Sequence, residues 1–134
     1  MSTVTEMIEF SIDREVAGPF DQAVDRLKAA LKARGFGTLT EVDVQATLRE
    51  KIGKEIAPYR ILGVCNPGLA AQALEAEPRI GVFLPCTVVV RESGGRVLVH
   101  AQDPGLMERI VVNPELAPLA QATRAGIVEA LEGA

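Results

Sequence analysis

The sequence predicts an α+β fold with two layers, in which a five-stranded, mainly antiparallel sheet carries long helices on one face. Strand and helix patterns follow in the order strand, helix, strand, short helix, strand, short helix, strand, strand, helix. Only the first connection has the length of a parallel crossover, and the last two strands form an antiparallel hairpin. The 134 residues fit a single domain, 1–134, which is long enough to bury a core without disulfides.

The first strand and the first long helix have the clearest patterns. Residues 7–13 alternate between polar side chains and the apolar side chains of Ile8, Phe10 and Ile12, as in a half-buried strand. Pro19 suits the first position of a helix, where its missing N–H costs nothing, and Gly35 ends that helix. The inward face of the helix carries Phe20, Val24, Leu27 and Leu31.

The next strand and helix are shorter. Residues 36–42 form the second strand, with a weaker pattern than the first. Asp43 then caps a short helix with Val44, Leu48 and Ile52 on one face, and Gly53 ends it.

The third strand leads directly into another helix. Residues 59–65 are almost continuously apolar, which is typical of a strand covered on both faces. Asn66 caps the helix, Pro67 takes its first position, and Pro78 ends it.

The fourth and fifth strands, residues 86–91 and 96–101, flank the sequence Glu-Ser-Gly-Gly. The turn has either four residues or only two, Gly94 and Gly95. Either register gives the same two faces. One face carries Cys86, Val88, Val90, Val97, Val99 and Ala101, and the other carries His100 with Thr87, Val89 and Leu98.

The last helix begins after two cap-and-proline pairs, Asp103-Pro104 and Asn113-Pro114. A start near Leu116 places Pro118 among the first-turn positions whose N–H groups have no helical partner. We therefore expect Asn113-Pro114 to form a separate turn. One face of the helix carries Leu119, Thr123, Ile127 and Leu131.

Composition and charge exclude several classes of function. Fourteen Lys and Arg against 18 Asp and Glu give a net charge of −4, and aromatic residues make up 4%, so no nucleic-acid partner is expected. No apolar run approaches the roughly 20 residues of a membrane span, and no signal peptide is recognised. Two cysteines fit a reducing compartment. These features favour a cytoplasmic protein with no membrane contact.

The sharpest local feature is the sequence Ile-Leu-Gly-Val-Cys-Asn-Pro-Gly at 61–68. It places Cys65 at the end of a buried strand, immediately before a capped helix N-terminus. The positive end of the helix dipole favours a thiolate at that place and lowers the pKa of the thiol. The alternative is that Cys65 is a small apolar core residue, which is the commoner situation for a free cysteine.

No metal and no cofactor are expected. Cys86 lies 21 positions after Cys65, a spacing that matches neither a zinc knuckle nor a redox Cys-x-x-Cys motif. His100 lies on the opposite face of the sheet from Cys86, and a single strand histidine is more often structural than a ligand. Asp103 precedes Pro104, which favours a helix cap over a catalytic carboxylate. Catalytic triads and phosphate-binding loops are not recognised.

Several segments between Thr40 and Pro104 together form a specific pattern. They read Glu-Val-Asp-Val-Gln at 41–45, Tyr-Arg-Ile-Leu-Gly-Val-Cys-Asn-Pro at 59–67, Ala-Glu-Pro-Arg-Ile-Gly at 76–81, Leu-Pro-Cys-Thr-Val-Val-Val at 84–90, and Asp-Pro at 103–104. This pattern resembles the bacterial and archaeal family called domain of unknown function 302.

The resemblance implies a β-α-β4-α fold of the TATA-binding-protein topology class and a homodimer, and it brings no assigned reaction. The family's motif positions fall on Cys65, Asn66, Pro67, Pro85, Cys86, Asp103 and Pro104. Thr87 stands where the family more usually has asparagine, and His100 is not a motif position.

We therefore predict a homodimeric small-ligand-binding protein. Its site is formed by Cys65, Asn66, Pro67, Cys86 and Asp103, and its helix N-terminus suits a small anionic ligand. A second copy of the chain is expected to cover the apolar open face of the sheet. Two alternatives stay open. One is a thiol-dependent redox or sulfur-transfer enzyme with Cys65 as nucleophile and Cys86 as resolving thiol. The other is a purely structural dimerisation domain.

Overall fold

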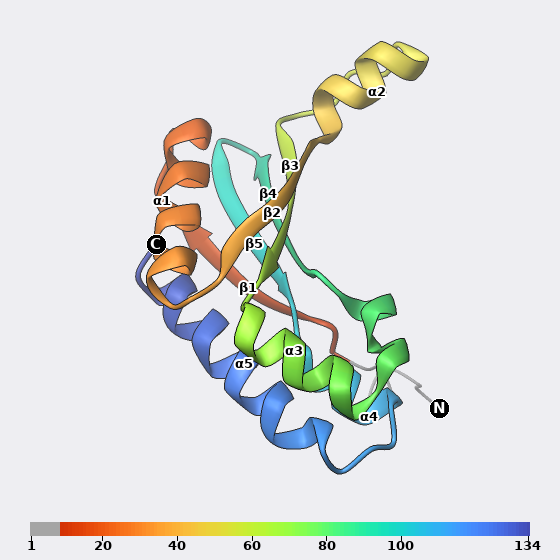
Figure 1. The fold of residues 1–134 in the computed structure, drawn as a ribbon. Coiled ribbons are helices and arrows are strands. Elements are labelled where there is room, and N and C mark those ends of the chain that lie inside the picture. Colours follow the sequence, from red (N-terminus) through yellow and green to blue (C-terminus); the bar gives the residue numbers. More distant parts are fainter. Residues whose placement is uncertain (1–8) are drawn as a thin grey trace, which may run out of the picture.

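A computed structural model describes residues 9–134 (Figure 1). Its strands are β1 (Ser11–Val16), β2 (Gly37–Asp43), β3 (Tyr59–Cys65), β4 (Cys86–Ser93) and β5 (Arg96–Gln102). Its α-helices are α1 (Phe20–Ala33), α2 (Val44–Ile52), α3 (Pro67–Ala76), α4 (Pro104–Ile110) and α5 (Leu116–Glu132). A 3-10 helix, η2 (Pro78–Phe83), lies between α3 and β4.

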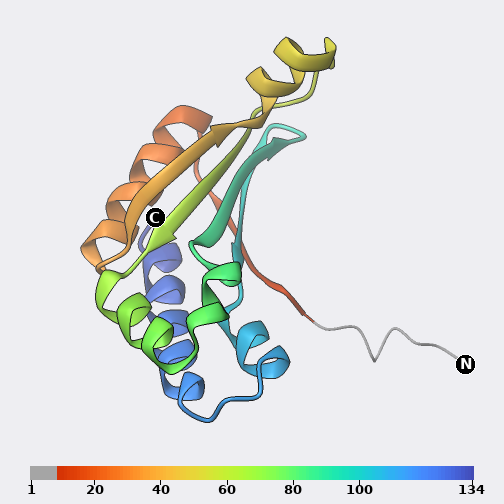
Figure 2. The same cartoon turned by 45° about the vertical axis from the view of Figure 1, so that its right-hand side comes forward.

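The five strands form one sheet in the order β1-β5-β4-β3-β2, and every neighbouring pair is antiparallel. The strands β1 and β2 therefore run in the same direction at opposite edges of the sheet, and α1 crosses over the three strands between them. Helices α1 and α5 lie on one face of the sheet (Figures 1 and 2). This arrangement confirms the predicted α+β fold with a five-stranded antiparallel sheet.

Two hydrophobic clusters form the interior. The larger lies between the sheet and helices α1 and α5, where Leu27, Leu62, Val88, Val99 and Ile127 are fully buried. The smaller lies beyond the end of the sheet, where α3, η2, α4 and α5 come together. Its buried residues are Ala73, Ile80 and Leu116, with Phe83, Leu84, Met107 and Leu119 packed against them. The cavity described below lies where the two clusters meet.

The first strand differs from the prediction. It begins at Ser11, which pairs with Gln102, and it continues to Val16. Phe10 is 67% exposed because it precedes the paired segment, although its sequence pattern assigned it to the core face. Ile8, which had the same assignment, lies outside the described residues.

The predicted caps are confirmed where the structure has helices. A carboxylate oxygen of Asp43 accepts a hydrogen bond from the Ala46 amide at 2.9 Å, and Gly53 ends α2 with a φ of +64°. Helix α5 begins at Leu116, as expected, after a turn in which the side chain of Asn113 accepts a bond from the Glu115 amide.

The hairpin is closed by the shorter of the two possible turns. Ser93 pairs with Arg96, which leaves Gly94 and Gly95 as a two-residue loop. Both glycines have positive φ, +58° and +78°, as a type I′ turn requires.

The order predicted from the sequence contained neither η2 nor α4. Both begin at a proline, Pro78 and Pro104, that follows a capping acidic residue.

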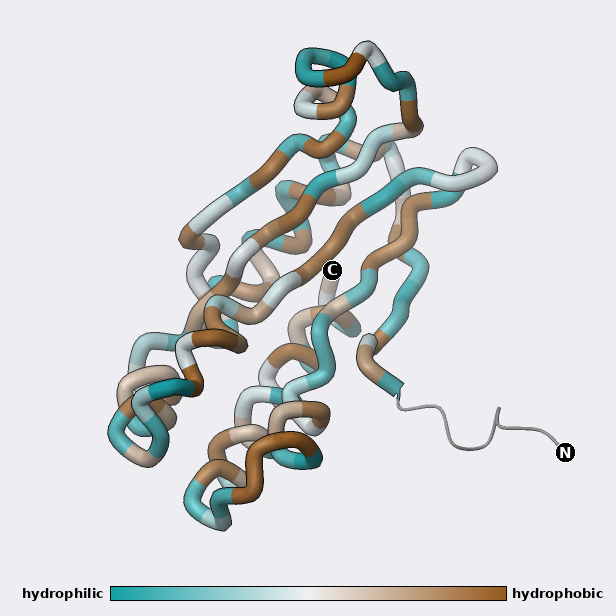
Figure 3. The backbone as a smooth tube through the Cα atoms, turned by 90° about the vertical axis from the view of Figure 1, so that its right-hand side faces the viewer, coloured by the Kyte–Doolittle hydropathy of each residue, from teal (hydrophilic) through white to brown (hydrophobic). Residues whose placement is uncertain are grey.

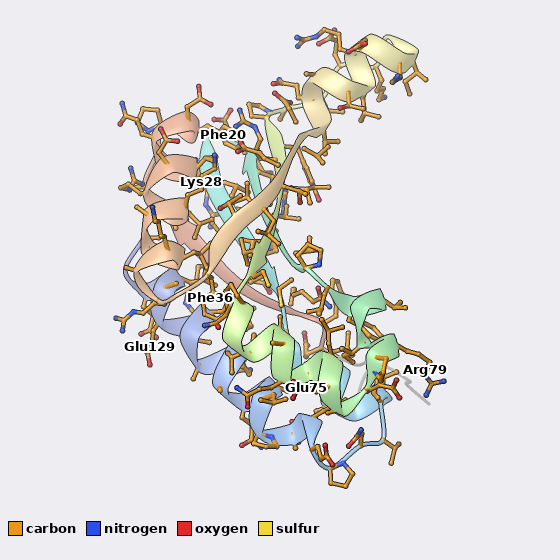
Figure 4. The ribbon with its side chains drawn as sticks, viewed as in Figure 1. Phe20, Lys28, Phe36, Glu75, Arg79 and Glu129 are labelled. Carbon is orange, nitrogen blue, oxygen red and sulfur yellow. The ribbon has the colours of Figure 1, made fainter. Side chains whose placement is uncertain are left out.

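A network of charged side chains closes the core at the N-terminal end of α1. The guanidinium of Arg60 lies over the Phe20 ring, 5.7 Å from its centroid, and donates to Glu41 at 2.6 Å. Lys28 also pairs with Glu41, and mainly its hydrogen bond holds the pKa of that carboxyl below its usual range. Figure 4 labels Phe20 and Lys28 on α1. Glu41 and Arg60 therefore serve to fix β2 and β3 to α1.

Helix α2 and most of the second face of the sheet are uncovered within the described residues, although Leu106 of α4 lies beside Val89 and His100 on that face. Helix α2 extends beyond the sheet and buries none of its residues, and Ile52 is 72% exposed (Figure 1). Figure 3, viewed from the side opposite α1, shows hydrophobic stretches along α2 and along the strands. Within residues 9–134, each helix is too short or too polar to cross a lipid bilayer.

Candidate functional site

A cavity of about 40 Å³ lies between the two hydrophobic clusters. Cys65, Asn66 and Cys86, three of the residues chosen from the sequence, line it together. Apolar side chains from several elements complete the wall, among them Phe36, Leu69, Ala70, Met107 and Leu119. Figure 4 shows Phe36 beside the first turn of α3. The fold therefore brings the residues of two motifs, 61–68 and 84–90, to one place.

The start of α3 forms one side of this cavity. The side chain of Asn66 accepts a hydrogen bond from the Leu69 amide at 3.2 Å, and the Asn66 carbonyl accepts one from Ala70. Pro67 has no N–H, so Gly68 supplies the remaining amide of the first turn, which in an α-helix has no partner of its own. At this helix N-terminus an anion can therefore interact with the Gly68 amide and with the helix dipole, and with few other groups.

Cys86 is the more buried of the two thiols and lies at the start of β4. Its neighbour across the sheet is Val64, so Cys65 is one residue away from direct pairing with it. Burial, with a smaller contribution from Cys65, raises the pKa of the Cys86 thiol to about 11. Cys86 is therefore a neutral thiol at neutral pH. Both cysteines are free.

Two of the predicted site residues do not line the cavity. A carboxylate oxygen of Asp103 accepts bonds from the Gly105 amide at 2.9 Å and from Arg124 at 3.1 Å, so this side chain caps α4 and binds α5. Its neighbour Pro104 does line the cavity. Pro67 is the exposed first residue of α3. Both residues shape the helices around the cavity.

Other lining residues could not be recognised from the sequence. Gln102 at the end of β5, Met107 in α4 and Thr123 in α5 all line the cavity. The side-chain oxygen of Gln102 accepts a hydrogen bond from the Thr87 amide at 3.3 Å, across β4 and β5. These residues belong to no local motif, and only the packing of α4 and α5 brings them to the site.

Gly63 explains how the segment before Cys86 approaches β3 so closely. A Cβ atom on Gly63 would lie 2.8 Å from Cγ of Pro85 and still closer to the hydroxyl of Thr40. A side chain at this position would therefore displace Pro85, which directly precedes β4.

His100 is fully engaged in hydrogen bonds on the open face of the sheet. Its Nδ1 lies 2.6 Å from a carboxylate oxygen of Asp13, and its Nε2 accepts a bond from Nε of Arg91 at 2.9 Å. His100 lies on the face opposite Cys86, as predicted. The bond to His100 is also the main reason that the pKa of Asp13 is lowered.

Among residues 9–134, no three His, Cys, Asp or Glu side chains gather closely enough to hold a metal ion as a cluster. The cavity is instead lined by hydrocarbon, sulfur and a few neutral polar groups. This composition suits a small, weakly polar or sulfur-seeking ligand better than a hard cation.

The family model described as Domain of unknown function DUF302 matches residues 12–134, which span nearly the whole chain. The chain belongs to this family. A solved relative is the uncharacterized conserved protein DUF302 from Bacillus stearothermophilus, whose crystal structure superposes with a TM-score of 0.87. The two chains are 30% identical over 93% of this chain and 98% of the other. No curated protein matches the chain. The DUF302 resemblance of the two cysteine motifs is thereby confirmed.

Proposed function

We propose that this DUF302 chain is a homodimeric small-ligand-binding protein whose site is the cavity at the Cys65-Asn66-Pro67 start of α3. The observation that supports this function is that Cys65, Asn66 and Cys86, from separate motifs, line one cavity. A site of this kind needs a few polar groups placed among apolar side chains, and this wall has that composition.

The volume of the cavity limits its ligand to a few atoms. A cavity must offer roughly 10–15 Å³ to hold one water molecule. The cavity of about 40 Å³ therefore accommodates a group about three times that size. It is far below the roughly 300–1,000 Å³ of sites for drug-sized molecules. The ligand, or the part of it that enters, has only a few non-hydrogen atoms.

Filling the cavity is expected to abolish binding of a small probe. Ala70 lines the cavity, whereas its neighbour Ala71 is exposed on the same helix, so Ala70→Leu and Ala71→Leu form a matched pair. Xenon is a suitable probe because it enters dry apolar cavities. In the wild type and in Ala71→Leu, xenon should shift the methyl resonances of Leu69 and Leu119 saturably. In Ala70→Leu these shifts should disappear.

Acetate provides the anionic arm of the same experiment. If the ligand is an anion that binds the Gly68 amide, acetate should compete with xenon in the wild type. If xenon shifts the resonances equally in Ala70→Leu and Ala71→Leu, or causes no shift in the wild type, the proposed ligand site in this cavity is wrong. If the protein is a dimer but has no ligand site, it is a purely structural dimerisation domain.

The homodimer is proposed to form through the open face of the sheet together with α2. Five strands of about seven residues present roughly 500 Å² on one face. A stable interface buries about 800 Å² on each partner, and the projecting α2 supplies further apolar surface. The charges on this face are paired within the chain, Glu15 with Arg96 and Asp13 with His100. Because each charge has a partner of opposite sign in its own chain, these charges cause little repulsion between two copies.

A lysine in the middle of this face is expected to separate the dimer. Val89 lies on β4 between Ile61 and His100, so Val89→Lys would bury an unpaired charge in the interface. Light scattering after size exclusion should give twice 14.3 kDa for the wild type and 14.3 kDa for the variant. The control is Val112→Lys, at a position that is 96% exposed between α4 and α5. A monomeric wild type would rule out the proposed dimer.

A second candidate function is thiol redox chemistry, because both cysteines are among the residues that line the same cavity. Oxidation would join the sulfurs of Cys65 and Cys86, release two protons and pass two electrons to an acceptor such as a low-molecular-weight disulfide. The raised pKa of Cys86 opposes this role, because about one molecule in 10⁴ carries its thiolate at pH 7. Rapid disulfide formation with oxidised glutathione at pH 7, lost in Cys86→Ala, would favour the redox candidate over simple binding.

A further inference from the structure

Helix α2 has an apolar face that is only partly covered within residues 9–134. Val44, Leu48 and Ile52 recur at intervals of four, so they share one side of the helix. The structure leaves Val44 and Leu48 half-buried and Ile52 72% exposed. An isolated helix in water needs about 12–15 residues to be stable, and α2 has nine. We therefore expect this face to pack against a surface that lies outside its own chain.

Helix α2 lies beyond one end of the sheet, and α4 lies at the other. The β3–β4 ladder pairs Tyr59, which follows α2 in the chain, with Arg91 near the hairpin turn, so α2 and that turn share one end. Helix α4 follows Gln102 at the far end of β5. Figures 1 and 2 show α2 on the side of the strands away from α1, which is the side of the open face. It is therefore placed to reach the open face of a second copy.

The α4 end of the open face contains an apolar hollow of about 330 Å³. Phe10 before β1, Val89 on β4 and Leu106 on α4 form its apolar wall. Phe10 is 67% exposed, and aromatic side chains of this kind often contribute most to an interface. The polar residues of the lining are Ser11, Thr87, His100 and Gln102. Both ring nitrogens of His100 already have partners within the chain, so an apolar residue can cover them at little cost.

Two copies that meet through their open faces can be related by a twofold axis in either of two directions. An axis along the strands places α2 beside α2 and hollow opposite hollow, which leaves the hollows unfilled. An axis across the strands places the α2 end of each copy over the α4 end of the other, so that the same contact occurs twice. Only the second arrangement brings the apolar face of α2 to an apolar hollow.

The area that a stable dimer needs also favours the axis across the strands. One face of the sheet presents roughly 500 Å², whereas a stable interface buries about 800 Å² on each partner. The contacts of α2 must therefore supply roughly 300 Å² on each copy. A helix that packs into a hollow can bury such an area, because both surfaces are apolar and uncovered within residues 9–134.

We propose that the apolar face of α2 in each copy docks in the hollow formed by Phe10, Val89 and Leu106 of a second copy. The inference rests on the homodimer proposed above, since it names the segments that form its contacts and the direction of its twofold axis. Helix α2 then acts as an arm that holds the α4 end of the other copy.

The test is a complementation between two variants, each of which damages one side of the contact. Ile52→Lys places a charge on α2, and Phe10→Glu places one in the hollow. Both positions are exposed, so neither substitution disturbs the core. Loss of a buried apolar side chain costs about tenfold in affinity or more, and each dimer contains the contact twice. Sedimentation equilibrium should therefore show each variant alone with a dissociation constant raised by about 100-fold.

An equal mixture of the two variants should recover part of the affinity. A mixed dimer has one undamaged contact, and in its other contact the two introduced charges are opposite in sign. Its dissociation constant should be about tenfold lower than that of either variant alone. If Phe10→Lys replaces Phe10→Glu, the introduced charges have the same sign, and the mixture should recover less. The control is Ala46→Lys, on the opposite and exposed face of α2, which should dimerise as the wild type does.

Hydrogen exchange provides a second measurement that needs no variant of the contact. The amides of α2 should exchange more slowly in the wild-type dimer than in the monomeric Val89→Lys variant, because the monomer leaves this short helix without packing.

The outcomes separate the docking of α2 from the dimer itself. A monomeric wild type would overturn both. If the wild type is a dimer but the mixture of Ile52→Lys and Phe10→Glu associates no more tightly than its components, α2 does not dock in the hollow and the dimer stands without this contact. Equal exchange of the α2 amides in dimer and monomer leads to the same conclusion. The xenon experiment decides the ligand site independently of these results.

Discussion

The folded chain should lose about 2 kcal/mol of stability between pH 9 and pH 11 because of Cys86 alone. The pKa of this thiol is about 11 in the folded protein, against 9.0 for an ordinary cysteine. Well below pH 9 the thiol is neutral in both states, so it contributes no pH dependence. Between the two values the unfolded chain ionises first, which stabilises the unfolded state. The free energy of unfolding therefore decreases as pH rises, and at pH 10.5 it has fallen by about 2 kcal/mol.

Urea unfolding at pH 8 and at pH 10.5 measures this effect. The result is the difference between the wild type and Cys86→Ala, in which the ionisation of all other groups cancels. The variant lacks the thiol and should lose less stability over the same interval. Cys86 in the folded wild type should also react with iodoacetamide at pH 8 roughly 100-fold more slowly than in the unfolded chain. If the free energy of unfolding changes equally with pH in the two proteins, Cys86 has an ordinary pKa.

Gly126→Ala should destabilise the protein by about 1–3 kcal/mol, although alanine favours helices over glycine by about 1 kcal/mol. Gly126 lies inside α5, where a Cβ atom would be 2.6 Å from Cε2 of Phe36 and 3.1 Å from its Cζ. The Phe36 ring is 2% exposed and also lines the cavity. The ring can move only by disturbing the core or the cavity wall.

Matched variants separate this clash from helix propensity. Gly68→Ala makes the same change in α3, where the added atom meets Asn66 Oδ1 at an ordinary 3.5 Å. It should leave the free energy of unfolding within about 0.5 kcal/mol or raise it. In a double-mutant cycle, Phe36→Leu should remove most of the penalty of Gly126→Ala. A Gly126→Ala variant as stable as the wild type would mean that Phe36 has room to move.

The local chemistry of the chain determined most of its secondary structure. The caps at Asp43 and Asn66 lie where the sequence predicts them, because a cap needs only a side-chain oxygen next to the first turn of its helix. The alternation of β4 and β5 assigned Cys86 and His100 to opposite faces, whichever turn joined the strands. These features depend on neighbours within a few residues, which the sequence contains directly.

Pairing between distant segments decided the remainder of the fold. The alternation near the N-terminus could not show that β1 begins at Ser11, because its ladder with β5 sets that limit. The choice of the two-residue turn at Gly94 and Gly95 depended in the same way on the pairing of Ser93 with Arg96. The first crossover joins strands at opposite edges of the sheet, which the length of α1 alone did not specify.

For the candidate site, the sequence by itself determined that two cysteine motifs, around Cys65 and Cys86, have a specific composition and belong to the DUF302 family. Only the tertiary structure decided that both cysteines line one cavity, that Asp103 caps α4 outside it, and that Met107 is a further lining residue. The physical reason is that a cavity is the space left where separate packed clusters meet. Its wall is therefore set by the packing of α3, α4 and α5 against the sheet and by no single segment of the chain.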